Sequence, residues 1–178
     1  ADAENKLILK VKNIDKLCIF TNNGNMHLVK VLDLPYGKFR DKGTPIDNVS
    51  NYDSSKEDIV FIAPLMDVEK HKLIFGTKSA MIKLMDDDEL LFVDMLSENA
   101  TMVMRSKKEM FLRIDCGTIP EKKKAAVGVR GMRLDREDEL TDIYLLNDQE
   151  EKEVEVKGKQ VALHRLHIAN RDTKGVKK

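Results

Sequence analysis

The sequence contains no apolar run that approaches the roughly eighteen residues of a membrane-spanning helix, and it does not begin with a secretory signal. Both absences favour a cytoplasmic protein that has no membrane partner. Cysteine is also scarce, because Cys18 and Cys116 are the only two. In a chain without an export signal, two cysteines so far apart are more typical of reduced core thiols than of a disulfide.

The signatures of catalytic and metal-binding sites are missing as well. The chain has no Cys-x-x-Cys pair, no glycine-rich phosphate loop, no Ser-His-Asp spacing and no pair of carboxylates at helical spacing. His164 and His167 come closest to a metal motif, but two residues three apart on a strand point to opposite faces. We therefore expect ordinary strand histidines, and a chain with no catalytic residue, no metal and no cofactor of its own.

A net excess of positive charge is lacking too, since 31 basic residues balance 31 acidic ones. Taken alone, this balance argues against a nucleic-acid partner. The charges are nevertheless segregated: residues 105–133 are mostly basic, residues 135–155 are mostly acidic, and the tail from Lys157 is basic again. A single charged block is usually a solvated face, so the meaning of these blocks depends on whether the basic ones recur at equivalent positions.

What the chain does contain is an internal repeat. Four segments each read as an apolar run of strand length, a polar turn and a second apolar run, which is the pattern of a β-hairpin: residues 16–29, 72–83, 100–113 and 154–165. Gly24 and Gly158 supply the positive φ that tight hairpin turns require. Further apolar strands close three of the repeats at residues 59–63, 90–93 and 140–146, and almost no helical pattern competes.

One repeat therefore comprises about four strands in roughly fifty residues, as in a blade of a propeller-like array. We predict an all-β fold of about four such blades in one domain, with repeats at residues 7–63, 64–95, 96–146 and 147–178. The second repeat is irregular, since about twenty residues expected between Ile82 and Met85 are missing, and the chain cannot cross a blade in two or three residues. Either the loop is deleted or a stretch has been left out there.

Several strings in the chain resemble a repeating pattern of one family: Phe20-Thr-Asn-Asn-Gly24, Gly43-Thr-Pro-Ile46 and Gly128-Val-Arg-Gly-Met-Arg-Leu134. The family comprises the C-terminal domains of the A subunits of bacterial type IIA DNA topoisomerases, DNA gyrase and topoisomerase IV. The resemblance extends from Lys16 to Gly175. It implies a β-pinwheel, whose blades exchange strands in a closed, open or partial ring, and a function in binding and bending DNA around the outer rim.

The resemblance also implies the partners and the parent enzyme. The partners would be double-stranded DNA, the ATPase B subunit of the parent enzyme and the catalytic core of the same A subunit, and the fragment itself would be a monomer. The parent would be an ATP-dependent isomerase that changes DNA topology, with its catalytic tyrosine and its nucleotide site outside this chain. The Gln-Arg-Arg-Gly-Gly-Lys-Gly box of gyrase is absent, which favours topoisomerase IV, although a gyrase fragment without its first blade would look the same.

The candidate DNA contacts are basic residues that recur in and beside the loop before the third strand of a repeat. Loops at matching positions of rotated blades would share a rim, and a stripe of cations there would form a track for a bent phosphate backbone. The candidates are Lys38, Arg40, Lys42, Lys122, Lys123, Lys124, Arg130, Arg133, Arg171 and Lys174. The acidic turns at residues 86–89 and 136–139 are expected to lie away from DNA.

Two other functions remain open. The first is a propeller-like scaffold that binds a protein partner through its acidic turns and exposed loops, without nucleic acid. The second is an enzyme with a site in a central channel, which is disfavoured because no cluster of titratable residues recurs on the inner strands. Binding to a random-sequence duplex at low and high salt would discriminate between DNA binding and the protein scaffold.

Overall fold

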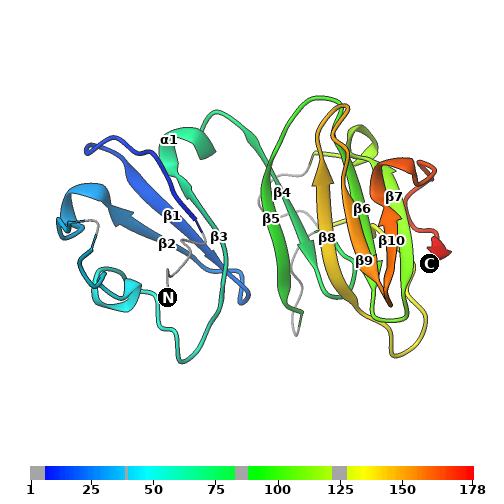
Figure 1. Ribbon diagram of the computed structural model, residues 1–178, viewed down its shortest axis with the longest axis horizontal. Coiled ribbons are helices and arrows are strands. Elements are labelled where there is room, and N and C mark those ends of the chain that lie inside the picture. Colours follow the sequence, from blue (N-terminus) through cyan, green and yellow to red (C-terminus); the bar gives the residue numbers. More distant parts are fainter. Residues whose placement is uncertain (1–6, 39, 83–87, 122–127) are drawn as a thin grey trace. The chain divides into compact units, whose positions relative to one another are not determined.

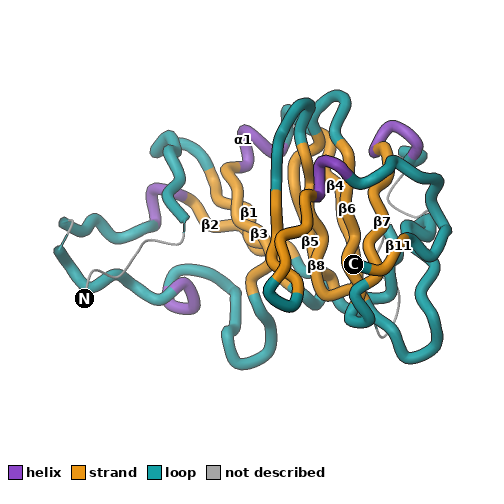
Figure 2. The backbone as a smooth tube through the Cα atoms, turned by 45° about the vertical axis from the view of Figure 1, so that its right-hand side comes forward, coloured by secondary structure: helices purple, strands orange, loops and turns teal. Residues whose placement is uncertain are grey.

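The computed structural model describes residues 7–38, 40–82, 88–121 and 128–178, and it confirms the predicted all-β, propeller-like fold (Figures 1 and 2). Only one α-helix, α1 (Leu65–Val68), occurs in these residues. The chain divides into two compact units, Ala1–His71 and Lys72–Lys178. The boundary falls inside the predicted second repeat because α1 belongs with the first sheet, where the Met66 backbone N–H donates to the Asp15 carboxylate at 3.3 Å. The division into four repeats stays a prediction.

The first unit contains a three-stranded antiparallel sheet in the order β2-β1-β3. Its strands are β1 (Lys16–Thr21), β2 (Met26–Lys30) and β3 (Ile59–Pro64). The β1–β2 hairpin turns at Gly24, whose φ of 78° confirms the positive φ expected there. Cys18 and Ile19 are neighbours on the central strand and are both fully buried, so both faces of β1 are covered.

The second unit contains three sheets with the orders β4-β5, β11-β7-β6-β8 and β10-β9. Their strands are β4 (Lys72–Thr77), β5 (Leu90–Leu96), β6 (Thr101–Ser106), β7 (Met110–Asp115), β8 (Leu140–Leu146), β9 (Glu153–Val156), β10 (Lys159–Ala162) and β11 (Val176–Lys177). The four-stranded sheet lies between the other two (Figure 1). None of the described sheets closes on itself, and the short β11 comes from the far end of the chain.

Two apolar layers hold the second unit together, one on each face of the four-stranded sheet. Met102 and Met104 point into the layer beneath β4 and β5, whereas Val103 points into the layer beneath β9 and β10. Phe111 on β7 joins Val103 in that second layer. Burying each of these side chains contributes about 1.5–3 kcal/mol, and this two-sided burial explains why β6 is apolar without alternation.

An acid–hydroxyl clamp recurs at one end of three sheets. A carboxylate two residues before the closing strand accepts a hydrogen bond from a hydroxyl at the hairpin turn, and the strand register shifts at the same point of β1, β4 and β6. The pairs are Thr21 with Glu57 at 2.7 Å, Ser106 with Asp138 at 2.8 Å, and Ser79 with Asp88. The expected acidic turns therefore include structural carboxylates. Their proposed position away from DNA stays a prediction, and residues 86 and 87 lie outside the described residues.

Several details differ from the pattern expected for a repeat. The described sheets have three, two, four and two strands instead of four each, because the predicted third strand is a 3-10 helix at Ile46–Asn48 in the first repeat and a pair of isolated bridges in the third. The second hairpin strand after β4 is likewise reduced to one bridge at Met81. The irregularity predicted between Ile82 and Met85 falls on residues 83–87, outside the described residues.

Both cysteines are free and buried, as expected. Burial, together with the nearby charge of Asp115, raises the pKa of the Cys116 thiol to about 12, so it stays protonated at neutral pH. His164 and His167 are not strand residues as predicted, since β10 ends at Ala162, His164 lies in a 3-10 helix, Leu163–Arg165, and His167 follows that helix. The chain leaves the strand there because Leu163 turns into the core, where it is fully buried.

Candidate nucleic-acid interface

The candidate interface is built on an extended segment, residues 129–133, that lies beside the end of the β4 hairpin. The Gly131 N–H donates to the Ala80 carbonyl at 2.8 Å, and the Ile82 N–H donates to the Val129 carbonyl at 2.8 Å. A Cβ at position 131 would lie 2.8 Å from the Met104 sulfur, so glycine allows the segment to lie directly against the core. This anchoring fixes the backbone from which the flanking arginines project.

The other side of the segment is bound by the C-terminal part of the chain. The Asp172 N–H donates to the Gly131 carbonyl and the Arg133 N–H donates to the Thr173 carbonyl, both at 2.9 Å, and Met132 bridges Thr173 in parallel. Met132 is buried, whereas Arg133 is exposed. Residues far apart in the sequence therefore meet at one surface of the second unit.

Four of the predicted DNA-contacting residues gather at this surface, and we call them the basic cluster: Arg130, Arg133, Arg171 and Lys174. Two of them share one carboxylate oxygen, because Arg130 Nη1 and Arg133 Nε lie 3.4 and 3.5 Å from Asp172 Oδ1. Partial burial acts to raise the pKa of Asp172, but the Arg133 and Arg130 guanidinium groups outweigh it and lower that pKa. Asp172 is thus ionised at neutral pH, and its carboxylate pairs with both guanidinium groups.

The other two members of the basic cluster are held differently. Arg171 is half-buried, and its guanidinium donates to the carbonyls of Thr118 and Arg130 at 3.3 and 3.1 Å, so it ties the loops together. Lys174 Nζ lies 2.5 Å from Asp135 Oδ1, and this hydrogen bond, with the charge of the ammonium, lowers the pKa of Asp135. Arg171 is therefore mainly a positioning residue, whereas Lys174 presents an exposed charge.

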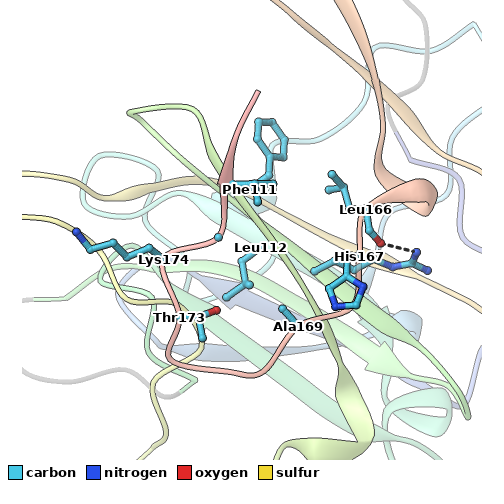
Figure 3. A pocket seen from close by; sticks show the side chains of 10 residues that line it. Phe111, Leu112, Leu166, His167, Ala169, Thr173 and Lys174 are labelled. Carbon is cyan, nitrogen blue, oxygen red and sulfur yellow. Dashed lines mark hydrogen bonds between the residues drawn. The ribbon is translucent and has the colours of Figure 1, made fainter.

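The loop that carries Lys174 also lines a hollow of about 310 Å³ against β7 (Figure 3). Phe111, Leu112 and Leu166 form its apolar wall, and Thr173 and Lys174 lie along the loop that returns to β11. Gly175 makes this return possible. Its φ is 75°, and a Cβ there would collide with the Phe111 carbonyl oxygen. The position of Lys174 thus depends on a close backbone approach.

The remaining predicted contacts lie elsewhere. Lys38, Arg40 and Lys42 are exposed in a loop of the first compact unit, which the Asp41 carboxylate closes by accepting from the Lys38 N–H at 2.6 Å. The loop lysines at positions 122, 123 and 124 lie outside the described residues. The structure therefore brings together candidates from the predicted third and fourth repeats. The candidates of the predicted first repeat lie in the other compact unit.

No pattern in the sequence indicated that the basic cluster would be partly neutralised. Asp172 pairs with arginines 39 and 42 positions away, and Asp135 pairs with Lys174 across a similar separation. Acidic residues so far apart in the sequence carry no periodic signal that would link them to these bases. Only the contact between the 129–133 segment and the C-terminal loop reveals the pairing.

Guanidinium and ammonium groups, which are typical partners of phosphates and carboxylates, gather at this surface. All of the ion pairs here are exposed, so water screens them and a phosphate can replace the carboxylates. In the described residues, no three His, Cys, Asp or Glu side chains gather closely enough to hold a metal ion. Within the same part of the chain, no helix is long and apolar enough to cross a membrane.

Comparison with known proteins finds similarity to the same family that the repeats resemble. Residues 103–147 match the family described as "DNA gyrase C-terminal domain, beta-propeller". The chain is 24% identical over 186 residues to the DNA gyrase A subunit of Lawsonia intracellularis, covering 90% of this chain and 23% of that protein. It is also 24% identical over 188 residues to the gyrase A subunit of Staphylococcus epidermidis, covering 92% and 21%. The chain thus spans less than a quarter of the length of these relatives.

The solved structures agree on the fold. The C-terminal domain of a DNA topoisomerase IV has a TM-score of 0.80 at 23% identity, over 92% of this chain and 58% of that one. The E. coli ParC C-terminal domain has a TM-score of 0.75 at 12% identity, over 96% and 79%. In sequence and in fold, this chain is therefore similar to the C-terminal domain of the A subunit of bacterial type IIA DNA topoisomerases, and the resemblance indicated by its repeats is confirmed.

Proposed function

We propose that this chain is a non-catalytic module that binds and bends double-stranded DNA for the A subunit of a bacterial type IIA topoisomerase. The observation that carries the proposal is the basic cluster, in which Arg130 and Arg133 of the third repeat lie beside Arg171 and Lys174 of the fourth. Successive repeats thereby contribute cations to one surface, as a track for a phosphate backbone requires.

The binding is sequence-independent, because arginine and lysine on phosphate oxygens position a duplex without reading its bases. Bending a duplex of 20 to 30 base pairs costs on the order of several kcal/mol, so contacts from more than one repeat must act together. The basic loop with Lys38, Arg40 and Lys42 would add contacts from the first repeat, and residues 122–124 would add further contacts from the third.

The parent enzyme would supply the chemistry. The core of its A subunit would break and rejoin the DNA and its B subunit would hydrolyse ATP, while this module delivers a bent segment. We assign none of the three tyrosines of this chain to that chemistry. The Tyr52 hydroxyl donates to the Glu57 carbonyl at 2.8 Å, and Tyr144 lies half-buried on β8. Tyr36 is exposed at the start of the first basic loop.

The test is binding of random-sequence duplexes of increasing length, measured by fluorescence anisotropy at about 50 and 200 mM salt and by energy transfer between dyes at the two ends. We expect affinity to fall steeply with salt and end-to-end distance to shorten once the duplex is long enough to reach several repeats. Charge reversal at Lys122, Lys123 and Lys124 should weaken both effects. A chain that binds no duplex at either salt concentration would instead favour a scaffold for protein partners.

A further inference from the structure

One turn recurs after the second strand of the hairpin in three repeats. A 3-10 helix follows the strand, and its first carbonyl accepts from the N–H three residues later at 3.1, 3.1 and 3.2 Å. The three helices are Val31–Asp33, Cys116–Thr118 and Leu163–Arg165. Because these turns align residue by residue, the chain contains three versions of the same loop start, and each shows what the fold requires there.

The residue five positions after the start of the turn differs in the three versions. It is Glu121 in the third repeat, where it pairs with Lys72 at 3.0 Å, and Ile168 in the fourth, where it bridges Arg113 on β7. In the first repeat it is Tyr36, which is 96% exposed. A glutamate serves the fold equally well at this place, so the aromatic ring of Tyr36 is not needed to form the turn.

The surroundings of Tyr36 point to a nucleic-acid ligand. The next residues along the loop include Lys38, Arg40 and Lys42, all exposed, and the single acid among them, Asp41, is engaged by the Lys38 N–H. Cations of this kind bind phosphates, whereas a bare aromatic ring gains by leaving water for the face of a base. DNA-bending proteins combine cations that bind the phosphate backbone with an apolar wedge that inserts between base pairs. An aromatic ring beside several cations offers the same combination.

We propose that Tyr36 is a wedge that enters the DNA bent on this chain. The ring inserts against a base step of the minor groove while Lys38, Arg40 and Lys42 hold the flanking phosphates, and the partly unstacked step localises the bend. The inference rests on the proposed DNA-binding function and adds to it a non-electrostatic contact. Phosphate contacts depend on salt, whereas an inserted ring contacts the bases directly, so the two kinds of contact leave separate signatures.

The experiment compares Tyr36→Ala and Tyr36→Phe with the unsubstituted chain on a duplex that carries 2-aminopurine at its centre and a dye at each end. We expect Tyr36→Ala to weaken binding about ten-fold, to abolish the rise in 2-aminopurine fluorescence and to reduce end-to-end energy transfer. The slope of affinity against salt should not change, because no charge is removed. Tyr36→Phe should keep all signals, since the ring makes the contact.

Leu32→Ala is the matched control, because Leu32 is 69% exposed in the preceding 3-10 helix and lies six residues before Lys38, whereas Tyr36 lies two residues before it. It should behave as the unsubstituted chain does. The proposal that Tyr36 is a wedge is wrong if the Tyr36→Ala variant unstacks and bends the duplex as the unsubstituted chain does. The proposed DNA-binding function survives that result if neutralising Lys38, Arg40 and Lys42 still lowers the slope of affinity against salt. If the unsubstituted chain binds no duplex at all, both proposals are overturned.

Discussion

The basic cluster offers a quantitative test through the double substitution Arg130→Gln with Arg133→Gln. Both guanidinium groups are more than half exposed, and they share a single oxygen of Asp172 at distances longer than those of strong charge-assisted hydrogen bonds. Glutamine keeps much of the length of the side chain and removes its charge. The fold should therefore tolerate the change, and any loss of DNA binding would report on phosphate contacts.

The size of the effect follows from counterion release. Each phosphate contact contributes about 0.9 to the slope of log affinity against log salt, so losing two contacts lowers the slope by about 1.8. Between 50 and 200 mM salt, one contact accounts for a change of about 3.5-fold in affinity and two contacts for about 12-fold. The double variant should bind DNA more weakly at low salt, and the slope of its log affinity against log salt should be smaller by about 1.8.

The assay is anisotropy titration of one random-sequence duplex at several salt concentrations, with thermal unfolding as a check on folding. Arg136→Gln is the matched control, since Arg136 is an exposed arginine of the same repeat that lies outside the basic cluster. Asp172→Asn should have the opposite effect, because it removes the carboxylate that phosphate must displace, and should tighten binding. A double variant with an unchanged slope, or a control with the same loss, would refute the assignment of these arginines to the DNA track.

Three further outcomes are expected. Gly158→Ala should cost about 1 kcal/mol of stability for its left-handed φ alone, whereas Gly175→Ala should cost more, on the order of 3 kcal/mol, because its Cβ also meets a backbone carbonyl of β7; chemical denaturation measures both. Asp138→Asn should cost about 1–3 kcal/mol, because one carboxylate oxygen accepts from the buried Ser106 hydroxyl and the other from backbone N–H groups, and asparagine keeps only one acceptor oxygen. Glu137→Gln should cost nothing in the same assay. The hydrogen bond with Lys56 lowers the pKa of Asp53 to about 2. The ionised Asp53 therefore stabilises the fold fully above about pH 4, and this stabilisation is lost as the pH falls towards about 2. The thermal midpoint of Asp53→Asn should fall less over this pH range than that of the unsubstituted chain.

Local patterns were enough to predict the hairpins and the closing strands. β1, β6 and β8 lie where their apolar runs predicted them, and the turn at Gly24 has the conformation that its residue type favours. These features depend on neighbours along the chain, namely the alternation or continuity of apolar residues and the φ that a turn requires. The resemblance of the repeats to one family also followed from such short strings.

The number of strands in each sheet could not be predicted in the same way. Residues 129–133 read as a strand, yet in the described residues they form only bridges, because their partners are the end of one hairpin and a loop near the C-terminus. The fourth strand of the central sheet, β11, comes from Val176 and Lys177, which show no strand pattern of their own. A sheet edge is filled by whichever segment the fold brings there, and local propensity does not encode that choice.

The features of the candidate site likewise divide into those that the sequence predicts and those that depend on the fold. Periodicity and residue type, which are local properties, were sufficient to predict the all-β fold and to suggest repeats whose bases recur in matching loops. Folding in three dimensions was needed to bring Arg130 and Arg133 to Arg171 and Lys174, to balance part of their charge with Asp172 and Asp135, and to leave Tyr36 bare where Glu121 is paired. Those outcomes depend on contacts between residues tens of positions apart, which form only when the chain folds back on itself.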